Sequence, residues 1–374
     1  MEYKEYELGD LLLYEQPTAY IVESTDYSDS YSVPVLTAGK SFILGYTNET
    51  TGVFDKLPVI IFDDFTTATQ YVNFPFKVKS SAMKILHINT DLVLPKYIFY
   101  RMQIIQFDHS THKRYWIQQY SRIKVSIPPI PEQERIVARI EELFSQLDAG
   151  VETLKNTKAQ LAVYRQAVLK EAFAGLTEKK PIREMSSLVT SGSRGWAQYY
   201  ADCGARFIRI TDLTRDGIQL KNDSIQYVAL PDKAEGKRSR LLGGDVLVSI
   251  TADLGSIALI PENIDEAYIN QHIAMARFNN PSQGEFMAWY LRSDWGQKDL
   301  LKNKRGGGKL GLGLDDIRDT PVPDVSDGTA QQIVAFIDDR LSICDSIEQT
   351  VNMALQQAEA MRQSILKDAF EGRL

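Results

Sequence analysis

Apolar residues recur at every seventh position in two stretches of the chain, one near its middle and one at its C-terminal end. A seven-residue apolar period is typical of paired helices, because it keeps one stripe of each helix facing the partner helix. Both stretches are poor in Gly and Pro and rich in Ala, Leu, Gln, Glu and Lys, which favours helix. The stripes are Ile140, Leu147, Leu154, Leu161 and Val168, and then Ile337, Cys344, Val351, Ala358 and Ile365. We therefore predict two helices of about 40 residues, ~60 Å long, that pair with each other as an antiparallel coiled coil.

The two helical stretches are copies of one another. Residues 136–175 align without a gap on residues 333–372, at an offset of 197 residues. The first copy opens IVARI and closes RQAVLKEAFAG, whereas the second opens IVAFI and closes RQSILKDAFEG. A Pro-x-Pro element stands before each copy, at Pro129-Ile130-Pro131 and at Pro321-Val322-Pro323. The repeat predicts a chain organised as domain, helix, domain, helix.

The two larger segments show short apolar runs with turn residues between them, which indicates strands. In each segment these runs lead into one amphipathic helical stretch, PKYIFYRMQII or GEFMAWYLRSDWGQKDL, and then into a basic loop. The fold class predicted is α/β (α+β), with two mixed domains separated by two long helices. The predicted boundaries are 1–131 for the first domain, 132–176 for the central helix, 177–328 for the second domain and 329–374 for the C-terminal helix.

Composition and charge narrow the class of protein. The chain has 374 residues, 44% hydrophobic and 24% charged, which is typical of a folded globular protein of two to three domains. Four histidines and two distant cysteines, Cys203 and Cys344, supply neither a zinc cluster nor a disulfide framework. No stretch has the basic flank and apolar core of a signal peptide or the length of a membrane span, so we expect a cytoplasmic protein without membrane contact.

The charge is unevenly distributed along the chain. A formal net charge of -7 argues against coating nucleic acid by bulk attraction, so any nucleic-acid contact has to come from local basic patches. Two such patches precede the Pro-x-Pro elements, within residues 95–125 and 292–310. Their matched placement in the two segments makes both candidates for phosphate contacts.

The repeated LK(E/D)AF helix ends, the Pro-x-Pro elements and PIPEQERIV after the first domain resemble the specificity subunits of type I restriction-modification systems. The resemblance covers essentially the whole chain. It implies two target recognition domains, each of which reads one half of an asymmetric bipartite site in double-stranded DNA. It also implies that the helices set the spacing of the half-sites and dock two modification (methyltransferase) subunits, which restriction (endonuclease/translocase) subunits then join. The chain stops at Leu374 just after the second helix, so the resemblance leaves the contact between the two termini open.

The same resemblance assigns the chemistry to the partners. No cofactor is expected in this chain, whereas S-adenosylmethionine, ATP and Mg²⁺ are expected in the partner subunits. The residues agree, because the only Pro-Pro pair, Pro128-Pro129, is followed by Ile130 and not by the aromatic residue of an amino-methyltransferase motif. The sequence at 306–311 satisfies GxGxxG, but it follows a predicted helix where a dinucleotide loop would follow a strand. We therefore predict a non-catalytic subunit.

Two alternatives remain open. A coiled-coil adaptor that joins proteins would show no salt-dependent affinity for duplex DNA. An autonomous nuclease would use Asp63 and Asp64, which are adjacent after a predicted strand, but no E-x-K element follows them, so a turn at the strand end is the better interpretation. His109 and His112 are spaced like half of a metal site, but without an acidic or cysteine cluster a surface loop is the better interpretation.

Polar loops flanked by cations are the candidates for reading DNA, because base edges are recognised by hydrogen-bond donors and acceptors and phosphates by cations. In the first domain the candidates are Thr66, Thr67, Thr69, Gln70, Lys77, Lys79, Ser80, Lys113, Arg114 and Tyr115. In the second domain they are Ser193, Arg194, Trp196, Tyr199, Asn270, Gln271, His272, Lys302, Lys304, Arg305 and Lys309. No residue-to-base code applies to such loops, so the recognised sequence is not predicted.

Overall fold

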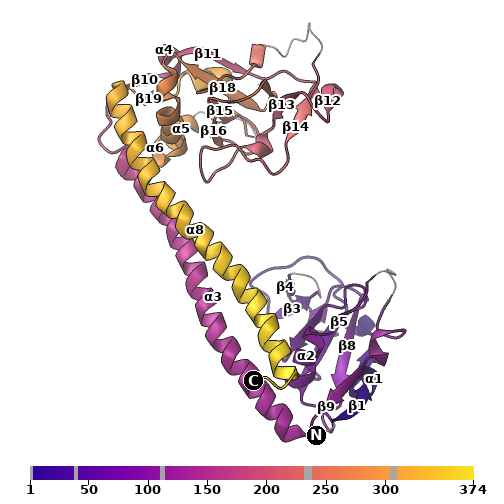
Figure 1. The fold of residues 1–374 in the computed structure, drawn as a ribbon. Helices are drawn as coiled ribbons and strands as arrows, with labels where there is room; N and C mark the ends of the chain where they lie inside the picture. Colours follow the sequence, from indigo (N-terminus) through magenta and orange to yellow (C-terminus); the bar gives the residue numbers. More distant parts are fainter. Residues whose placement is uncertain (1–2, 38–40, 110–113, 231–237, 303, 305–309) are drawn as a thin grey trace. The chain divides into compact units, whose positions relative to one another are not determined.

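The computed structural model describes residues 3–37, 41–109, 114–230, 238–302, 304 and 310–374. The chain divides into two compact units, shown in Figure 1. Unit 1 combines residues Met1–Leu154 with residues Met353–Leu374, and unit 2 consists of residues Lys155–Asn352. Unit 1 is therefore built from both ends of the chain. Within the described residues, the helices lack the length and apolar character needed to span a membrane.

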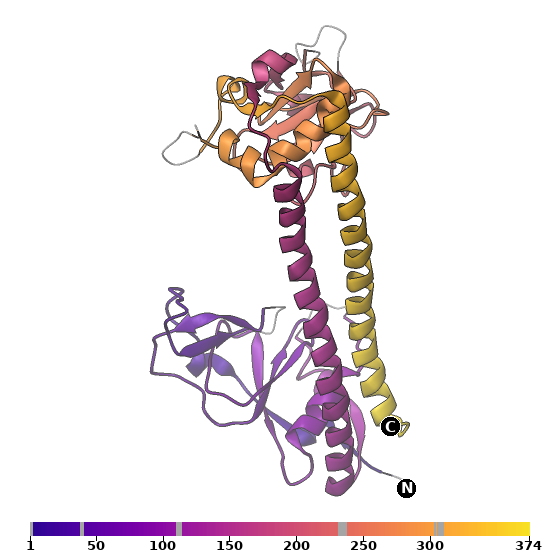
Figure 2. The same ribbon diagram turned by 90° about the vertical axis from the view of Figure 1, so that its left-hand side faces the viewer.

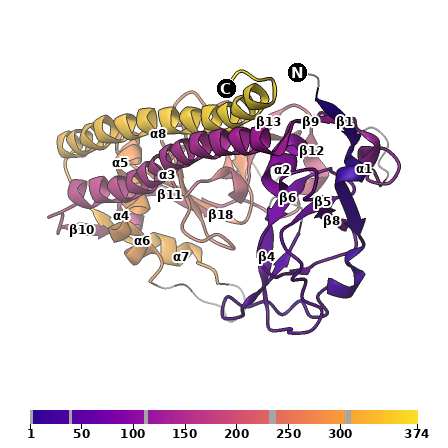
Figure 3. The same ribbon diagram turned by 90° about the horizontal axis from the view of Figure 1, so that it is seen from below.

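Unit 1 contains a four-stranded antiparallel sheet in the order β2-β8-β5-β6, a three-stranded sheet β4-β3-β7 and a two-stranded sheet β1-β9. The strands are β1 Lys4–Glu7, β2 Leu12–Glu15, β3 Val33–Leu36, β4 Ile43–Thr47, β5 Val59–Asp63, β6 Thr69–Val72, β7 Lys77–Val78, β8 Met83–Ile88 and β9 Lys124–Ile127. The helices are α1 Leu8–Leu11 and α2 Pro95–Gln103, with 3-10 turns η1 Pro17–Tyr20 and η2 Tyr120–Arg122. Figure 3 shows α2 beside β6 and the start of the long helix α3.

Unit 2 follows the same plan, with four-stranded sheets β11-β18-β15-β16 and β12-β14-β13-β17 and a two-stranded sheet β10-β19. The strands are β10 Lys179–Pro181, β11 Ser186–Ser191, β12 Tyr200–Ala201, β13 Ala205–Ile208, β14 Gln226–Val228, β15 Val246–Ser249, β16 Ile257–Leu259, β17 Ala267–Ile269, β18 Ile273–Phe278 and β19 Pro321–Pro323. The helices are α4 Ile182–Met185, α5 Gly284–Arg292, α6 Asp294–Leu300 and α7 Leu314–Arg318, with 3-10 turns η3 Trp196–Tyr199, η4 Ile210–Asp212 and η6 Pro281–Gln283. The predicted mixed fold with two long helices is confirmed.

The long helices are α3, Ile130–Ala172, and α8, Asp327–Phe370, of 43 and 44 residues. In unit 1 the start of α3 buries Ile140 and Phe144 in one core with Leu366 from the end of α8. In unit 2 the end of α3 buries Leu169 in one core with Ile337 from the start of α8. The helices are antiparallel in each unit, and Figures 1 and 2 show them side by side.

The repeated AF at the end of each long helix is a docking element. In unit 2 the Phe173 ring lies 5.6 Å from the Phe286 ring and 5.4 Å from the Tyr290 ring, both on α5. In unit 1 the equivalent Phe370 ring lies 5.3 Å from the ring of Tyr97 on α2. Edge-to-face contacts of this kind add to the burial energy of the rings. Each domain therefore packs against the end of the long helix that follows the other domain.

The helix seam also contains charged pairs, and these are repeated. Arg165 of α3 donates to Asp345 of α8 at 2.6 Å in unit 2. Arg362 and Asp148, which lie at the same positions of the repeat, form the same ion pair in unit 1. Both pairs lie at the solvent-facing edge of the seam, because the Asp345 and Asp148 side chains are 69% and 60% exposed. Exposed ion pairs contribute little free energy, so these pairs favour the register that the apolar residues set.

The start of α3 is anchored by Gln133, which is fully buried. Its side-chain oxygen accepts the Leu94 N–H at 2.8 Å, and its amide nitrogen donates to the carbonyl oxygens of Pro128 at 2.9 Å and Leu92 at 3.1 Å. This explains the Gln of PIPEQERIV, since the side chain ties the Pro-rich turn to the residues before α2. The C-terminal end of α8 meets the same region, because Arg135 donates to the Leu374 carbonyl oxygen at 3.3 Å.

We predict that Gln133→Leu lowers the free energy of unfolding by about 2–4 kcal/mol, because it leaves the backbone groups of Leu92, Leu94 and Pro128 without the buried side chain that bonds them. Gln332→Leu, the same substitution at an exposed position in the first turns of α8, is the control and should change stability by less than about 0.5 kcal/mol. Urea denaturation followed by circular dichroism measures both. Equal destabilisation of the two variants would contradict the role assigned to Gln133.

Candidate nucleic-acid interface

The turn between β5 and β6 gathers the candidate residues of unit 1. Asp63 accepts the backbone N–H groups of Phe65 and Thr66, both at 2.8 Å, and so closes the turn. Thr67 has a positive φ of 58°, which is uncommon for a residue with a branched side chain. His109 holds it there, because its Nε2 lies 2.9 Å from the Thr67 hydroxyl and 3.0 Å from the Thr66 carbonyl oxygen.

Asp64 joins three segments under this turn. Its carboxylate accepts the Trp116 N–H at 2.8 Å and lies 3.4 Å from the Lys84 ammonium, and its carbonyl oxygen accepts the Tyr115 N–H at 3.0 Å. Its own N–H donates to Ala82. The polar turn, the segment that contains Ser80 and the segment that contains Arg114 are thereby brought together. Asp64 and Lys84 are both buried, which makes Asp64 a structural ion-pair residue and removes it from a nuclease site.

Three predicted contacts in unit 1 are wrong, because the side chains are internal. Lys77 is 3% exposed, pairs with Glu49 at 2.9 Å and donates to the Thr51 carbonyl oxygen at 2.7 Å. Thr69 is buried and accepts a hydrogen bond from Gln103 on α2. Tyr115 is buried against the rings of Phe107 and His109.

The exposed or half-buried candidates of unit 1 form what we term surface 1. Lys79 is exposed beside Tyr27, with its ammonium 3.4 Å from the phenol oxygen. The members of surface 1 are Thr66, Thr67, Gln70, Lys79, Ser80 and Arg114. Lys113 and His112 lie outside the described residues. Surface 1 therefore presents hydroxyl, amide and cationic groups at one end of the four-stranded sheet.

Unit 2 brings its candidates together at the corresponding hairpin, between β15 and β16. Ser193 forms a parallel bridge with Asn270, which places the loop before η3 beside the turn between β17 and β18. His272 in that turn lies 2.6 Å from the hydroxyl of Thr251, and Thr251 bridges to Gly311 beyond the basic loop. Ala252 has a positive φ of 57°, like Thr67 in unit 1. The close approach at the bridge leaves no room for a Cβ atom at Gly192, where it would meet the Ile269 carbonyl oxygen at 1.8 Å.

One predicted contact in unit 2, Trp196, is wrong because its side chain is buried, and another, Tyr199, is only half-buried. Trp196 is buried against the rings of Phe207 at 4.7 Å and Tyr268 at 5.6 Å, so it supports the loop from below. Tyr199 is half-buried and packs against the same cluster. Burial, together with the hydrogen bond to Glu266, raises the pKa of Tyr268 to about 12.

The accessible candidates of unit 2 form what we term surface 2. Arg194, Lys302 and Lys304 are exposed, and the polar side chains of the β17–β18 turn are half-buried. The members of surface 2 are Ser193, Arg194, Asn270, Gln271, His272, Lys302 and Lys304. Arg305 and Lys309 lie outside the described residues, as does most of the GxGxxG stretch.

Two residues that contact these surfaces were missed by sequence reasoning. His109, interpreted from sequence as a surface-loop residue, holds the β5–β6 turn, and Thr251 occupies the equivalent hairpin of unit 2. A signal existed for Thr251, since it follows a buried strand as Thr66 does. Among the described residues, no three His, Cys, Asp or Glu side chains gather as metal ligands would. The arrangement offers hydrogen-bond groups with a cationic rim, which suits base edges and phosphates.

Comparisons with known proteins identify the relatives of this chain. Residues 1–162 match the family described as type I restriction modification DNA specificity domain. The chain is 39% identical over 239 residues to the specificity subunit of the type I restriction enzyme EcoR124I/EcoR124II of Escherichia coli. That match covers 60% of this chain and 58% of the relative, so the chain spans less than two thirds of the relative's length. The resemblance identified from the sequence is confirmed.

Solved structures show a similar fold. One comes from work on complex assembly and conformational transition of the type I R-M system, with a TM-score of 0.73 and 16% identity over 100% of this chain and 98% of that one. The HsdS subunit from Thermoanaerobacter tengcongensis matches with a TM-score of 0.51 and 16% identity, over 100% of this chain and 97% of that one. At this identity the likeness concerns the fold alone.

We predict that Asp64→Asn destabilises the protein by about 3 kcal/mol or more, because the buried Lys84 ammonium is left without its counter-charge. Asp91→Asn, at an exposed position after β8, should be nearly neutral and is the control. Thermal unfolding of the purified chain measures the difference. A stable Asp64→Asn variant that no longer performed a divalent-ion-dependent cleavage of DNA would instead restore the nuclease hypothesis.

Proposed function

We propose that this chain, a relative of the type I restriction enzyme specificity subunits, is the DNA sequence-recognition subunit of such a complex. The observation that carries the proposal is the repetition of one scaffold with two different polar surfaces. Units 1 and 2 share the order of the four-stranded sheet and a hairpin turn that contacts a histidine, yet surfaces 1 and 2 have different side chains. A duplicated scaffold with divergent surfaces suits the reading of two different half-sites.

In this proposal each surface enters one major groove and reads one half of a bipartite site. Hydroxyl and amide groups such as those of Thr66 and Asn270 contact base edges, while Lys79, Arg194 and Lys304 contact phosphates and set the position on the duplex. The long helices hold the spacing between half-sites and dock two modification subunits. Methyl transfer, and cleavage by restriction subunits, are performed by the partners with S-adenosylmethionine, ATP and Mg²⁺.

The competing hypotheses explain less of the structure. A nuclease that used Asp63 and Asp64 would need both carboxylates free for a metal, whereas Asp63 closes a turn and Asp64 is buried in an ion pair. An adaptor without DNA binding would not need exposed cations beside polar turns in both units. The adaptor hypothesis and the proposed function both place partner binding on the helices. A measurement of affinity for duplex DNA therefore distinguishes them.

The direct test exchanges the first domain. Replacing residues 1–131, the predicted domain 1, with the corresponding domain of a relative should change one half of the methylated sequence and leave the other half and the gap unchanged. Methylome sequencing of cells that carry the chain with its modification subunit reads the result. Changes in both halves, or methylation without sequence preference, would count against the assignment of one surface to each half-site.

The cations of surface 2 should act on every sequence alike. Lys302→Ala with Lys304→Ala should weaken binding of the assembled complex to cognate and scrambled duplexes and reduce the log-log salt slope, by up to about 0.9 for each phosphate that is no longer neutralised. Salt titrations on both duplexes provide the measurement. If only cognate binding fell and the slope stayed the same, these two lysines would be base readers.

A further inference from the structure

One residue of the β5–β6 hairpin has its backbone bonded to two other segments of unit 1. The Asp64 N–H donates to the carbonyl oxygen of Ala82, just before β8, at 3.2 Å. The Asp64 carbonyl oxygen accepts the N–H of Tyr115, just after the basic loop, at 3.0 Å. These two hydrogen bonds mark the position at which the hairpin leaves the sheet.

Ile250 has the same two backbone hydrogen bonds in the β15–β16 hairpin of unit 2. Its N–H donates to the carbonyl oxygen of His272, just before β18, at 2.9 Å. Its carbonyl oxygen accepts the N–H of Leu312, just after the basic loop, at 3.0 Å. Strands β8 and β18 hold the same place in their sheets, whose orders are β2-β8-β5-β6 and β11-β18-β15-β16. Ile250 is therefore the equivalent of Asp64.

The residue after this anchor differs in chemistry between the two units. In unit 1 it is Phe65, whose side chain is 46% exposed and belongs to none of the hydrophobic clusters of the described residues. In unit 2 it is Thr251, whose hydroxyl lies 2.6 Å from Nδ1 of His272. Nε2 of His272 lies in turn 2.9 Å from the Gln271 amide nitrogen. Unit 2 thus has a chain of three polar side chains where unit 1 has an exposed apolar ring.

The turn that carries Phe65 is fixed by its neighbours and not by the ring. Oδ1 of Asp63 accepts the N–H groups of Phe65 and Thr66, both at 2.8 Å. Nε2 of His109 lies 3.0 Å from the Thr66 carbonyl oxygen and 2.9 Å from the Thr67 hydroxyl. Because the turn is already formed, a ligand that contacts the ring pays little conformational entropy for ordering it.

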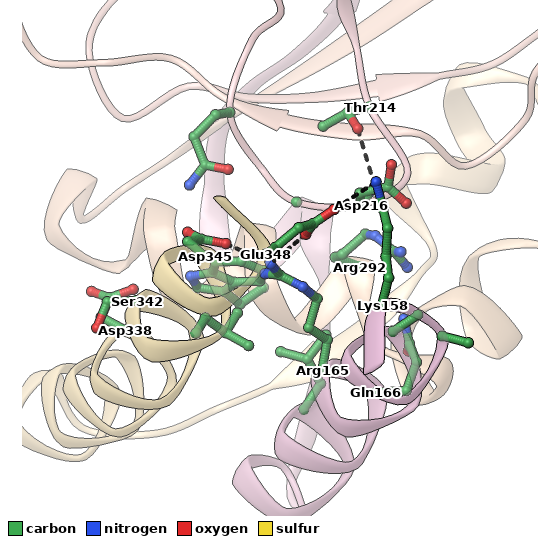
Figure 4. A pocket seen from close by; sticks show the side chains of 17 residues that line it. Lys158, Arg165, Gln166, Thr214, Asp216, Arg292, Asp338, Ser342, Asp345 and Glu348 are labelled. Carbon is green, nitrogen blue, oxygen red and sulfur yellow. Dashed lines mark hydrogen bonds and ion pairs between the residues drawn. The ribbon is translucent and has the colours of Figure 1, made fainter. Parts of the chain in front are cut away.

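The hairpin of unit 2 is fixed by an arginine from another segment. Arg215 donates to the Asp253 carboxylate and to the Leu254 carbonyl oxygen, both at 2.7 Å. Figure 4 shows the chain neighbours of Arg215, Thr214 and Asp216, on the wall of a groove of about 740 Å³ beside α3 and α8. Arg215 therefore ties this hairpin to the segment beside the long helices. In both units, side chains from outside the hairpin tip hold it in place.

An exposed phenyl ring in a major groove has one apolar partner among the base edges. Guanine, cytosine and adenine present hydrogen-bond donors and acceptors there, whereas thymine also presents its C5 methyl group. Thr66 and Thr67 carry the hydroxyl groups that suit the polar edges. The Phe65 ring suits the methyl group.

We propose that Phe65 packs against the C5 methyl group of a thymine in the half-site that unit 1 reads. The inference rests on the proposed function and adds one base contact to it. It also gives the difference between Phe65 and Thr251 a consequence. At this position of the scaffold, unit 1 reads an apolar group and unit 2 presents hydrogen-bond groups.

The test replaces each thymine of that half-site, one at a time, by deoxyuridine, which pairs in the same way but lacks the methyl group. Fluorescence anisotropy measures DNA binding by the full-length chain assembled with its modification subunits. With the unsubstituted chain, one replacement should weaken binding about four- to tenfold, the effect of removing one buried methyl group. Phe65→Ser should lose the same factor on the thymine duplex and show no further loss on the deoxyuridine duplex.

Two further variants control for the fold and for apolar surface in general. Phe65→Leu keeps an apolar side chain and should keep most of the deoxyuridine penalty. Leu13→Ala changes a 72% exposed position of β2, at the end of the sheet away from the hairpin, and should alter neither affinity nor penalty. All three variants should melt at the temperature of the unsubstituted chain, because neither side chain belongs to a core.

A deoxyuridine penalty that Phe65→Ser leaves intact, or a half-site in which no thymine methyl group affects binding, would overturn the inference. Equal loss by Phe65→Ser on cognate and scrambled duplexes would also overturn it, because the ring would then contact DNA without reading a base. If the unsubstituted complex did not distinguish the two duplexes, the proposed function would fail as well. Sequence-specific binding that Phe65→Ser leaves unchanged would remove this inference alone.

Discussion

The docking of each helix end onto a domain helix is the contact on which the rest of the structure depends. Unit 1 needs residues from both ends of the chain, because the core around α2 includes Leu366 and Ala369 beside residues near the N-terminus. Phe370 completes that core as Phe173 completes the core of unit 2. Unit 1 is thus discontinuous in sequence, whereas unit 2 is one continuous stretch, Lys155–Asn352, that contains the end of α3 and the start of α8. The helices are antiparallel in each unit, because the start of one long helix and the end of the other enter the same core.

The repeat gives the two units a similar scaffold, and the surfaces that differ between them are those that we propose contact DNA. The ion pairs Arg165–Asp345 and Arg362–Asp148 recur at the same positions of the repeat and join the two helices at the exposed edge of the seam. The polar turns lie at strand ends, where substitutions do not disturb the cores. For this reason surfaces 1 and 2 can differ while the fold is kept.

The sequence predicted the helices, the repeat and the mixed domains, because seven-residue periodicity and a fixed offset are properties of the chain itself. It failed for side chains whose environment depends on distant segments. Lys77 was a candidate for phosphate contact, yet Glu49 and a backbone carbonyl from the β4–β5 connection surround it. Trp196 and Tyr115 were candidates because they lie in a polar loop and a basic loop, but both side chains are buried.

The dependence of each unit on the end of a long helix can be measured by hydrogen–deuterium exchange on the full-length chain, with Phe370→Ala and Phe173→Ala compared. We expect faster exchange in α2 peptides for Phe370→Ala and in α5 peptides for Phe173→Ala, because each ring closes the core of one unit. Val163→Ala, at an exposed position on α3, should change neither set of peptides. If Phe370→Ala altered only peptides of α8 and left α2 as in the unsubstituted chain, the first unit would not depend on the C-terminal helix end, and the docking of helix ends would not be what holds the fold together.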